Sequence, residues 1–360
     1  MTGARVMIMA GGTGGHVFPA LAVAQALQRR GVEVIWLGVR GGFEDGVVCQ
    51  AGYPLEYIEI RGLRGQGIGR WLLAPLRLLR ALWQSLRALR RQRPRLVLGM
   101  GGFLSGPGGV AARLLGIPLV IHEQNALPGL TNRLLARLAS RVLEAFPGSF
   151  GRRPGVLAVG NPVRPEIAAL RDPSARFAGR EGPLRLLVLG GSLGAQALNE
   201  TVPAALARLP PGLPRPQVRH QAGRGKADAT VAAYANLGVT AEVVPFIADM
   251  AEAYAWADLV ICRAGALTVA ELAAAGVGAI LIPYPHAVDD HQTHNAAFLV
   301  QAGAAQRLPQ PELTPERLAE LLAGLCNGRG RVRAMAFAAR SLARPEATET
   351  VARICEEALL

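Results

Sequence analysis

Short apolar runs, each followed by glycines and then by a longer stretch of helix formers, recur along this chain. The clearest case spans residues 258–276. Residues 258–262 are apolar and of strand length, residues 263–265 suit a turn, and residues 266–275 are rich in helix formers before Gly276. This order predicts a strand, a tight turn and a helix, the repeating unit of a parallel α/β sheet.

The same order opens each half of the chain. Residues 5–10 precede GGTGGH and a helical run at 19–29, and residues 184–189 precede GGSLGA about half the chain length later. This repetition predicts two similar α/β halves that face each other. We expect further strands at 32–38, 55–60, 96–100, 119–122, 141–145, 156–159, 243–246 and 279–283. The sequence GNPVR at 160–164 is expected to be a hinge between the halves.

The turn before residues 266–275 suits an anion, because a helix N-terminus presents backbone N–H groups and the positive end of its dipole. The Thr268 hydroxyl can bind a phosphate, and Glu271, on a neighbouring face, can bind a ribose diol. The alternative is a plain covering helix with a capping threonine and a surface glutamate. This stretch alone does not separate the two interpretations.

Polar residues follow two other predicted strands. The loop GGTGGH is neither a Walker loop nor a G-x-G-x-x-G motif, and its side-chain chemistry comes from Thr13 and His16. His16 could be a ligand-facing group or an ordinary hydrogen-bonded residue in a first helical turn. Glu123, Gln124 and Asn125 end another strand, where a doubly wound sheet keeps its ligand crevice.

Composition narrows the class of protein. The 360 residues are 51% apolar and carry a net charge of +13, with Lys226 the only lysine, so acidic partners are favoured. Four scattered cysteines match neither a zinc site nor a disulfide framework, which predicts reduced thiols and a cytoplasmic protein. We expect neither a signal peptide nor a transmembrane segment.

Residues 61–95 contain ten arginines and no acidic residue. The second part predicts a helix with Trp71, Leu72, Leu76, Leu79, Trp83 and Leu86 on one side and arginines on another, interpreted as a sheet-covering helix with a solvated charged face. The loop before it is different. Leu63, Arg64 and Ile68 place apolar side chains among cations, which predicts a peripheral contact with an anionic membrane.

A second polar loop, PYPHAVDDHQTHNA, follows the strand expected at 279–283. Its histidines and aspartates match no zinc signature, and the chain holds no Asp-x-Asp motif, so we expect no metal. Recognition of sugar hydroxyls suits the loop better.

Together, GGTGGH, GLRGQGI, GMGGFLSGPGG, HEQNALPGLTN, GNPVR, GGSLGA, CRAGALTVAE and DHQTHNA resemble, in order and along nearly the whole chain, the MurG family of peptidoglycan glycosyltransferases. The resemblance implies transfer of N-acetylglucosamine from UDP-N-acetylglucosamine to lipid I, making lipid II at the cytoplasmic face of the membrane. It also implies a GT-B fold of two Rossmann-like domains, residues 1–161 and 162–342, flanking a central cleft. The final helix, residues 343–360, would return to the first domain.

The resemblance also implies roles for individual residues. Uracil would lie near Ile247, the ribose on Glu271, and the pyrophosphate at Ser192 and the start of the helix. Arg164 would serve the donor, Asn125 and Gln292 the N-acetylglucosamine, and Thr13, Gly14, Gly15 and His16 the acceptor side. The full helical segment assigned to the donor is Ala266, Leu267, Thr268, Val269, Ala270 and Glu271. The loop HAVDDHQ departs from the family pattern, so no role carries over to His291.

Inverting transfer needs a base for the acceptor hydroxyl and stabilisation of the leaving diphosphate. His16 is our first choice for the base and Glu123 the second. Helix amides, hydroxyls and Arg164 would replace a metal, and no cofactor is expected. A UDP-N-acetylglucosamine epimerase of similar fold is the alternative enzyme. Nucleic acid is not an expected partner, because aromatic residues are not interleaved with the arginines.

Overall fold

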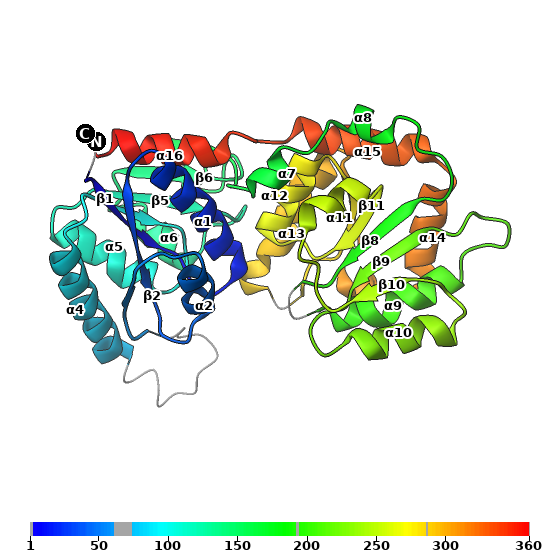
Figure 1. The fold of residues 1–360 in the computed structure, drawn as a ribbon, viewed down its shortest axis with the longest axis horizontal. Coiled ribbons are helices and arrows are strands. Elements are labelled where there is room, and N and C mark those ends of the chain that lie inside the picture. The colour runs from blue at the N-terminus through cyan, green and yellow to red at the C-terminus, as the bar shows by residue number, and fades with distance from the viewer. Residues whose placement is uncertain (1–2, 61–73, 192–193, 286, 360) are drawn as a thin grey trace. The chain divides into compact units, whose positions relative to one another are not determined.

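The computed structural model describes residues 3–60, 74–191, 194–285 and 287–359 (Figure 1). The chain forms two compact units, Met1–Arg164 with Pro345–Leu360, and Pro165–Arg344. Across the described ranges, no helix is both long and apolar enough to cross a membrane.

The N-terminal unit is a parallel sheet with helices on both faces. Its strands are β1 (Arg5–Met9), β2 (Glu33–Gly38), β3 (Leu55–Tyr57), β4 (Leu96–Gly99), β5 (Leu119–Glu123), β6 (Arg141–Glu144) and β7 (Val156–Ala158). Its helices are α1 (Gly14–Arg29), α2 (Phe43–Gln50), α4 (Ala74–Gln92), α5 (Ser105–Leu114), α6 (Leu130–Leu135) and α16 (Ala347–Glu357). In the described residues the seven strands lie in the order β3-β2-β1-β4-β5-β6-β7.

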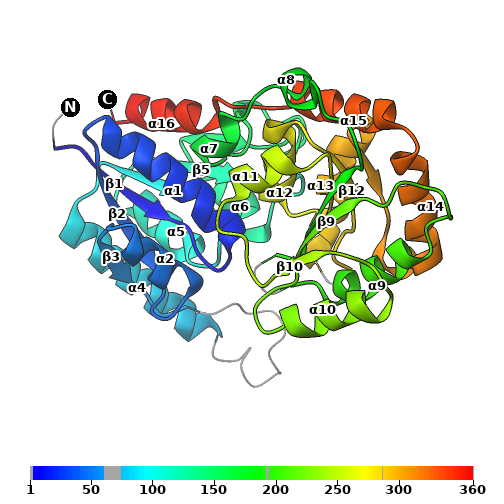
Figure 2. The ribbon, with the colours of Figure 1, turned by 45° about the vertical axis from the view of Figure 1, so that its right-hand side comes forward.

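Alternation along the strands divides the N-terminal core into two layers, because successive side chains point to opposite faces. Val6 and Ile8 of β1 pack with α1 and α16, whereas Met7 and Met9 pack with α4, α5 and α6. Helix α16, the red segment that runs beside α1 in Figure 2, comes from the end of the chain and completes the first layer. Its apolar face, including Val351, is fully buried there.

The C-terminal unit repeats this architecture. Its strands are β8 (Arg185–Leu189), β9 (Gln217–Gln221), β10 (Glu242–Val244), β11 (Leu259–Cys262), β12 (Gly278–Leu281) and β13 (Ala305–Arg307). Its α-helices are α7 (Pro165–Ala168), α8 (Pro173–Phe177), α9 (Gln196–Ala207), α10 (Ala227–Asn236), α11 (Met250–Trp256), α12 (Ala266–Ala275), α13 (His291–Gln301), α14 (Pro315–Cys326) and α15 (Arg329–Ser341). Two 3₁₀ turns are η1 (Val288–Asp290) and η2 (Gln310–Glu312). The described strands form one parallel sheet, β10-β9-β8-β11-β12-β13.

Each sheet changes direction of strand order at one point. In the N-terminal unit the order reverses between β1 and β4, and in the C-terminal unit between β8 and β11. Ligands of open α/β sheets bind beyond the carboxyl ends of the strands at such a point. The glycine loops after β1 and β8 and the turn after β11 all start there.

Two strands were not predicted from the sequence. Strand β9 reads QVRHQ and contains a single aliphatic residue, and β13 is only three residues long. Neither shows the apolar run typical of a buried parallel strand. Both are held by backbone pairing with a neighbouring strand, β8 in one case and β12 in the other.

The arginine-rich helix covers the sheet as expected, but the prediction was wrong about most of the large apolar side chains it placed there, because of those described Leu86 alone packs against the core. On α4, Leu76, Leu79 and Trp83 are 64%, 62% and 59% exposed. The buried residues are smaller on the whole: Ala74, Ala81, Ser85, Ala88 and Leu89. Small side chains allow the helix to pack closely on the sheet and on α5, so the larger apolar residues are left on the outside. Trp71 and Leu72 lie outside the described residues.

Candidate active site

The turn after β11 has the geometry of an anion site. Gly265 is the N-cap of α12 in extended conformation, and no side chain caps the helix there. The predicted end is also confirmed, because Gly276 adopts a left-handed φ of 61°. Of the first-turn residues, Leu267 and Thr268 are half-buried, whereas the Val269 side chain is fully buried and serves packing. The backbone and Thr268 are therefore the groups that can meet a ligand.

Glu271 lies one turn further along α12, and the surface-glutamate interpretation is wrong. The residue is only 4% exposed, and one of its carboxylate oxygens accepts a hydrogen bond from the Tyr254 hydroxyl at 3.2 Å. Tyr254 is itself fully buried on α11. A buried carboxylate needs hydrogen-bond partners. This arrangement holds the carboxylate in one orientation close to the start of the helix.

Two amide side chains of α13 hold the turn that precedes α12. Gln292 Oε1 accepts from the backbone N–H of Ala264 at 3.2 Å and from that of Tyr284 at 2.9 Å. Asn295 Nδ2 donates to the Ala264 carbonyl at 3.2 Å. Both backbone groups of Ala264 are thus fixed by side chains. Since Gln292 uses its oxygen this way, it can meet a sugar only through its Nε2–H donors.

A buried polar group supports the loop that follows β8. The Asn199 amide on α9 donates to the Ala222 carbonyl at 2.9 Å and contacts His220 Nε2 at 3.1 Å, and His220 Nδ1 lies 2.9 Å from the Tyr234 hydroxyl. Burial lowers the pKa of His220 to about 4, so the ring is neutral. A side chain at Gly194 would collide with the Ala222 carbonyl, which explains the glycine. Ser192, in this loop, lies outside the described residues.

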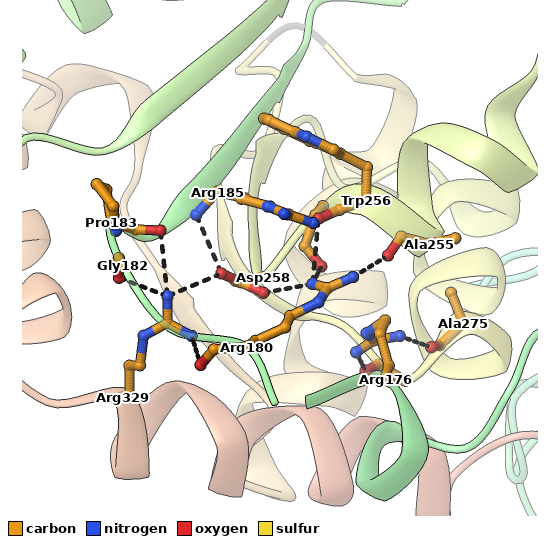
Figure 3. A network of polar contacts seen from close by, with 12 residues as sticks. Arg176, Arg180, Gly182, Pro183, Arg185, Ala255, Trp256, Asp258, Ala275 and Arg329 are labelled. Atoms are coloured by element: carbon orange, nitrogen blue, oxygen red, sulfur yellow. Dashed lines mark hydrogen bonds and ion pairs between the residues drawn. The ribbon is translucent and has the colours of Figure 1, made fainter. Parts of the chain in front are cut away.

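The C-terminal ends of α11 and α12 are held by arginines (Figure 3). Arg180 pairs with the buried Asp258 at 2.5 Å and donates to carbonyls at the end of α11. Arg176 and Arg340 donate to the last carbonyls of α12, and burial lowers the pKa of Arg176 to about 10. Cations at a helix C-terminus stabilise its dipole. The cluster therefore anchors the helix whose other end is the candidate anion site.

In the N-terminal unit, the turn after β1 places Thr13, Gly14, Gly15 and His16 together. Thr13 is the exposed N-cap of α1, and His16 is half-buried in the first turn. Gly101, after β4, lies against the His16 ring, because a Cβ there would be 2.6 Å from its Nδ1. The two loops thus meet at the point where the strand order reverses.

His16 also contacts the polar residues that end β5. Its Nδ1 lies 2.9 Å from Gln124 Oε1, and Gln124 Nε2 lies 3.0 Å from Nδ1 of His122. His122 is fully buried, and its Nε2 lies 2.9 Å from the Gly160 carbonyl oxygen. Gln124 was expected at the ligand crevice without a role of its own, and His122 was not among the residues expected to form the site.

Glu123 is buried and its two oxygens are engaged. One accepts from the backbone and side-chain amides of Asn125, at 2.9 and 3.2 Å. The other accepts from the Gly129 backbone and from Asn132 Nδ2, at 3.2 and 2.9 Å. Glu123 is 2% exposed, so its clear structural effect is to order residues 125–132.

The remaining predicted residues are more dispersed. Ile247 is half-buried in the loop after β10, and Arg164 ends the first segment of the N-terminal unit. The proposed membrane residues Leu63, Arg64 and Ile68 lie outside the described residues. Tyr254 had no predicted role, because it acts through a partner distant in sequence. Asn295 belongs to the loop expected to recognise sugar hydroxyls, and its amide donates to the Ala264 carbonyl. Over the part of the chain that is described, no group of His, Cys, Asp or Glu forms a metal-binding cluster.

Two family models match the two units. Residues 6–144 match the glycosyltransferase family 28 N-terminal domain, and residues 185–351 match the glycosyltransferase family 28 C-terminal domain. Together they cover most of the chain.

Full-length relatives give the same assignment. The chain is 60% identical over 354 residues to a Marinobacter nauticus protein named UDP-N-acetylglucosamine–N-acetylmuramyl-(pentapeptide) pyrophosphoryl-undecaprenol N-acetylglucosamine transferase, covering 98% of this chain and 97% of that one. The crystal structure of Acinetobacter baumannii MurG is 44% identical with a TM-score of 0.87, covering 98% and 99%. A UDP-GlcNAc 2-epimerase from Neisseria meningitidis is 11% identical with a TM-score of 0.66, covering 98% and 100%, and shares the fold alone.

Proposed function

The chain belongs to the MurG family of family 28 glycosyltransferases, and from this premise we propose that it transfers N-acetylglucosamine from UDP-N-acetylglucosamine to lipid I, the undecaprenyl-diphosphate-linked muramyl peptide. The product is lipid II, a precursor of peptidoglycan. The observation that carries the proposal is identity of 60% over nearly the full length of a relative with that named activity. The fold is GT-B, with one parallel α/β sheet in each unit.

The donor is assigned to the C-terminal unit. The backbone N–H groups at Ala266, Leu267 and Thr268, with the Thr268 hydroxyl, would bind the diphosphate, because a helix N-terminus favours negative charge. Glu271 would accept hydrogen bonds from the ribose diol. Gln292 would donate to the sugar through Nε2, because its oxygen already holds Ala264 and Tyr284.

Further donor contacts are assigned by the resemblance. Ile247 would present its backbone to uracil, Ser192 would meet the pyrophosphate, and Arg164 would offer a cation to the donor. Asn125 would bind the N-acetylglucosamine. The hydrogen bonds from Asn125 to Glu123 support this role, since they hold the amide in one place.

The transfer step needs one proton acceptor. The muramyl 4-hydroxyl oxygen attacks C1 of the N-acetylglucosamine, its proton passes to His16, and the bond from C1 to the diphosphate oxygen breaks with its electron pair leaving on UDP. Attack opposite the leaving group inverts the α-linkage to β. The charge that develops on UDP is stabilised by the start of α12. Thr13, Gly14 and Gly15 would meet the acceptor beside His16.

His16 suits the role of base better than Glu123. His16 is half-buried in a glycine-rich turn, and a neutral imidazole has one ring nitrogen with a lone pair that can take a proton. Glu123 is 2% exposed and already accepts four hydrogen bonds. Taking a proton would require Glu123 to give up contacts that order residues 125–132.

We place the enzyme peripherally on an anionic membrane, the surface that holds its lipid-linked acceptor. The support is the outer face of α4, α5 and α6, helices that themselves contain no acidic residue. Exposed there are the apolar residues Leu76, Leu78, Leu79, Trp83, Leu114, Leu130 and Leu134. Exposed arginines accompany them, among them Arg77, Arg87 and Arg113. Apolar side chains that enter the headgroup region among cations that meet anionic lipid favour such a contact.

The direct test is incubation with labelled UDP-N-acetylglucosamine, with and without a lipid-linked muramyl acceptor. Transfer predicts label in the lipid fraction only when the acceptor is present, together with stoichiometric UDP. An epimerase would convert UDP-N-acetylglucosamine to its 2-epimer without acceptor. That second result would overturn the proposed function.

A further inference from the structure

The candidate base, His16, lies at one end of a chain of hydrogen bonds. The other end is buried, and the group there determines which member of each pair donates. The chain runs from His16 through Gln124 and His122 to the carbonyl of Gly160, with contacts of 2.9, 3.0 and 2.9 Å. A carbonyl oxygen can only accept a hydrogen bond. His122 Nε2 must therefore carry a hydrogen and donate it to Gly160.

The protonation state of His122 determines the next contact. His122 is fully buried, and this burial lowers its pKa to about 4, so the ring is neutral near pH 7. A neutral ring with hydrogen on Nε2 has an acceptor at Nδ1. Gln124 must then donate to it through Nε2, which fixes the amide orientation and leaves Oε1 towards His16. The contact therefore requires a hydrogen on His16 Nδ1.

We propose that His122 and Gln124 are positioning residues that fix the tautomer of His16, with hydrogen on Nδ1 and the lone pair on Nε2. The inference rests on the proposed function only where it makes Nε2 the atom that takes the acceptor proton. A base must present a lone pair, and the free histidine side chain favours the opposite tautomer, with hydrogen on Nε2. In serine proteases a buried partner of the catalytic histidine does the same work, and the wrong tautomer costs about 10⁴-fold in kcat.

Other contacts hold these side chains in place. Gln124 is 1% exposed, and the Asn161 amide donates to its backbone carbonyl at 3.0 Å. Gly101 packs on the His16 ring at a position where any side chain would displace it. The His16 backbone N–H donates to the Thr13 carbonyl at 3.1 Å, which holds the His16 backbone in the first turn of α1.

A purely structural role makes a different prediction. If the three polar residues only satisfied one another in the core, removing Gln124 would lower stability but leave kcat and the His16 tautomer unchanged. The test therefore needs a reading of the tautomer itself. The two nitrogens of an imidazole have distinct ¹⁵N shifts according to which one carries hydrogen.

We would record long-range ¹H–¹⁵N spectra of histidine-labelled full-length protein, and identify the His16 signals from their loss in His16→Gln. Wild type is expected to show hydrogen on Nδ1 of His16. Gln124→Leu is expected to move the population towards Nε2–H and to lower kcat about 10-fold or more, with KM little changed. Gln28→Leu is the control, because Gln28 also lies on α1, and its Oε1 accepts a hydrogen bond from the Tyr53 hydroxyl and not from His16.

Gln124→Glu supplies the conservative comparison. A carboxylate oxygen still accepts from His16 Nδ1, so the tautomer of His16 is retained, whereas the donor to Nδ1 of His122 is lost and stability should fall. A negative charge beside the base favours its protonated form, so the acid limb of kcat/KM should move to higher pH. Melting curves show which variants are folded, and spectra and kinetics are compared only among the folded variants.

Wild type with hydrogen on Nε2 of His16, or Gln124→Leu with an unchanged tautomer, would overturn the inference. A tautomer that changes in Gln124→Leu while kcat does not would uphold the role of His122 and Gln124. That same result would overturn the assignment of His16 as base. The two proposals can therefore fail separately.

Discussion

Glu271 shows how much a single residue depends on its neighbours. Its place three residues after Thr268 put it on a neighbouring helix face, which suggested a ribose ligand or a surface residue. Burial and the hydrogen bond from Tyr254 remove the surface interpretation. A carboxylate this buried also carries a desolvation cost, which hydrogen bonds from a ribose diol would offset.

We predict that Glu271→Ala binds UDP about 10- to 150-fold more weakly, the loss expected for a charge-assisted hydrogen bond of about 1.5–3 kcal/mol. Glu271→Gln should lose less, because its amide oxygen can still accept. Calorimetric titration with UDP and 2′-deoxy-UDP measures both. Wild type should prefer UDP, and Glu271→Ala should bind the two alike.

A folded Glu271→Ala variant with unchanged UDP affinity would show that the carboxylate is only structural. Melting curves are the control. The removal also takes an acceptor from the Tyr254 hydroxyl, so a modest loss of stability is expected in either case.

At the scale of the element, α12 is fixed at both ends by different means. Its N-terminal turn is held by Gln292 and Asn295 through Ala264. Its C-terminal carbonyls accept hydrogen bonds from Arg176 and Arg340. The neighbouring α11 ends on Arg180, which also pairs with Asp258 (Figure 3). A helix held in this way can present its N–H groups without reorganising when the ligand arrives, the condition for electrostatic stabilisation.

Arg180→Ala should lower the free energy of unfolding of the C-terminal unit by about 3 kcal/mol. The change leaves the Asp258 carboxylate, 1% exposed, with the Arg185 N–H at 3.1 Å and Arg329 at 3.9 Å. Denaturant unfolding measures the loss. Arg317→Ala is the control, because its pair with Glu320 is exposed and should contribute less than about 1 kcal/mol. Equal losses in both variants would contradict this account of the buried pair.

At the scale of the whole molecule, charge is unevenly distributed. The chain carries +13 overall, yet residues 60–122 include no acidic side chain. The helices of this stretch lie on one face of the N-terminal sheet, together with α6. Folding therefore gathers the arginines and the exposed apolar residues onto one surface.

We predict that Leu79→Gln with Trp83→Gln weakens binding to anionic vesicles about 10-fold or more, since each buried apolar side chain contributes about 1.5–3 kcal/mol. Co-sedimentation with vesicles of anionic and of neutral lipid measures this. Binding should fall in high salt and on neutral lipid, because the arginine contribution is screened or lost. Val231→Gln with Leu237→Gln is the matched control, since both residues are comparably exposed on the C-terminal unit. Equal binding by both double variants would reject this face as the membrane contact.

Turnover should also be independent of divalent metal. The charge on the leaving diphosphate would be met by helix amides, Thr268 and Arg164, which supply positive potential without a metal. The measurement is the rate of transfer to a soluble acceptor analogue in excess chelator. Loss of turnover in chelator and its return with magnesium or manganese would contradict the prediction.

Local signals in the sequence determined much of this protein. Apolar runs followed by glycines gave most of the strands and the start and stop of α12, because strand burial and a left-handed Gly276 are dictated by nearby residues. The motifs gave the family. They also placed His16 and Asn125 at strand ends, where parallel sheets bind ligands.

Only the tertiary structure decided which polar groups touch. The pair of Tyr254 with Glu271 and the chain from His16 to Gly160 join residues far apart in sequence. The polar strand β9 and the outward side of α4 likewise depend on neighbours that the local sequence does not show. Periodicity shows that a helix has an apolar side, but not which side a sheet will cover, and no local pattern reports the partner of a buried hydrogen bond. Those contacts form because each buried polar group must find a partner within the fold, and the partner is set by packing.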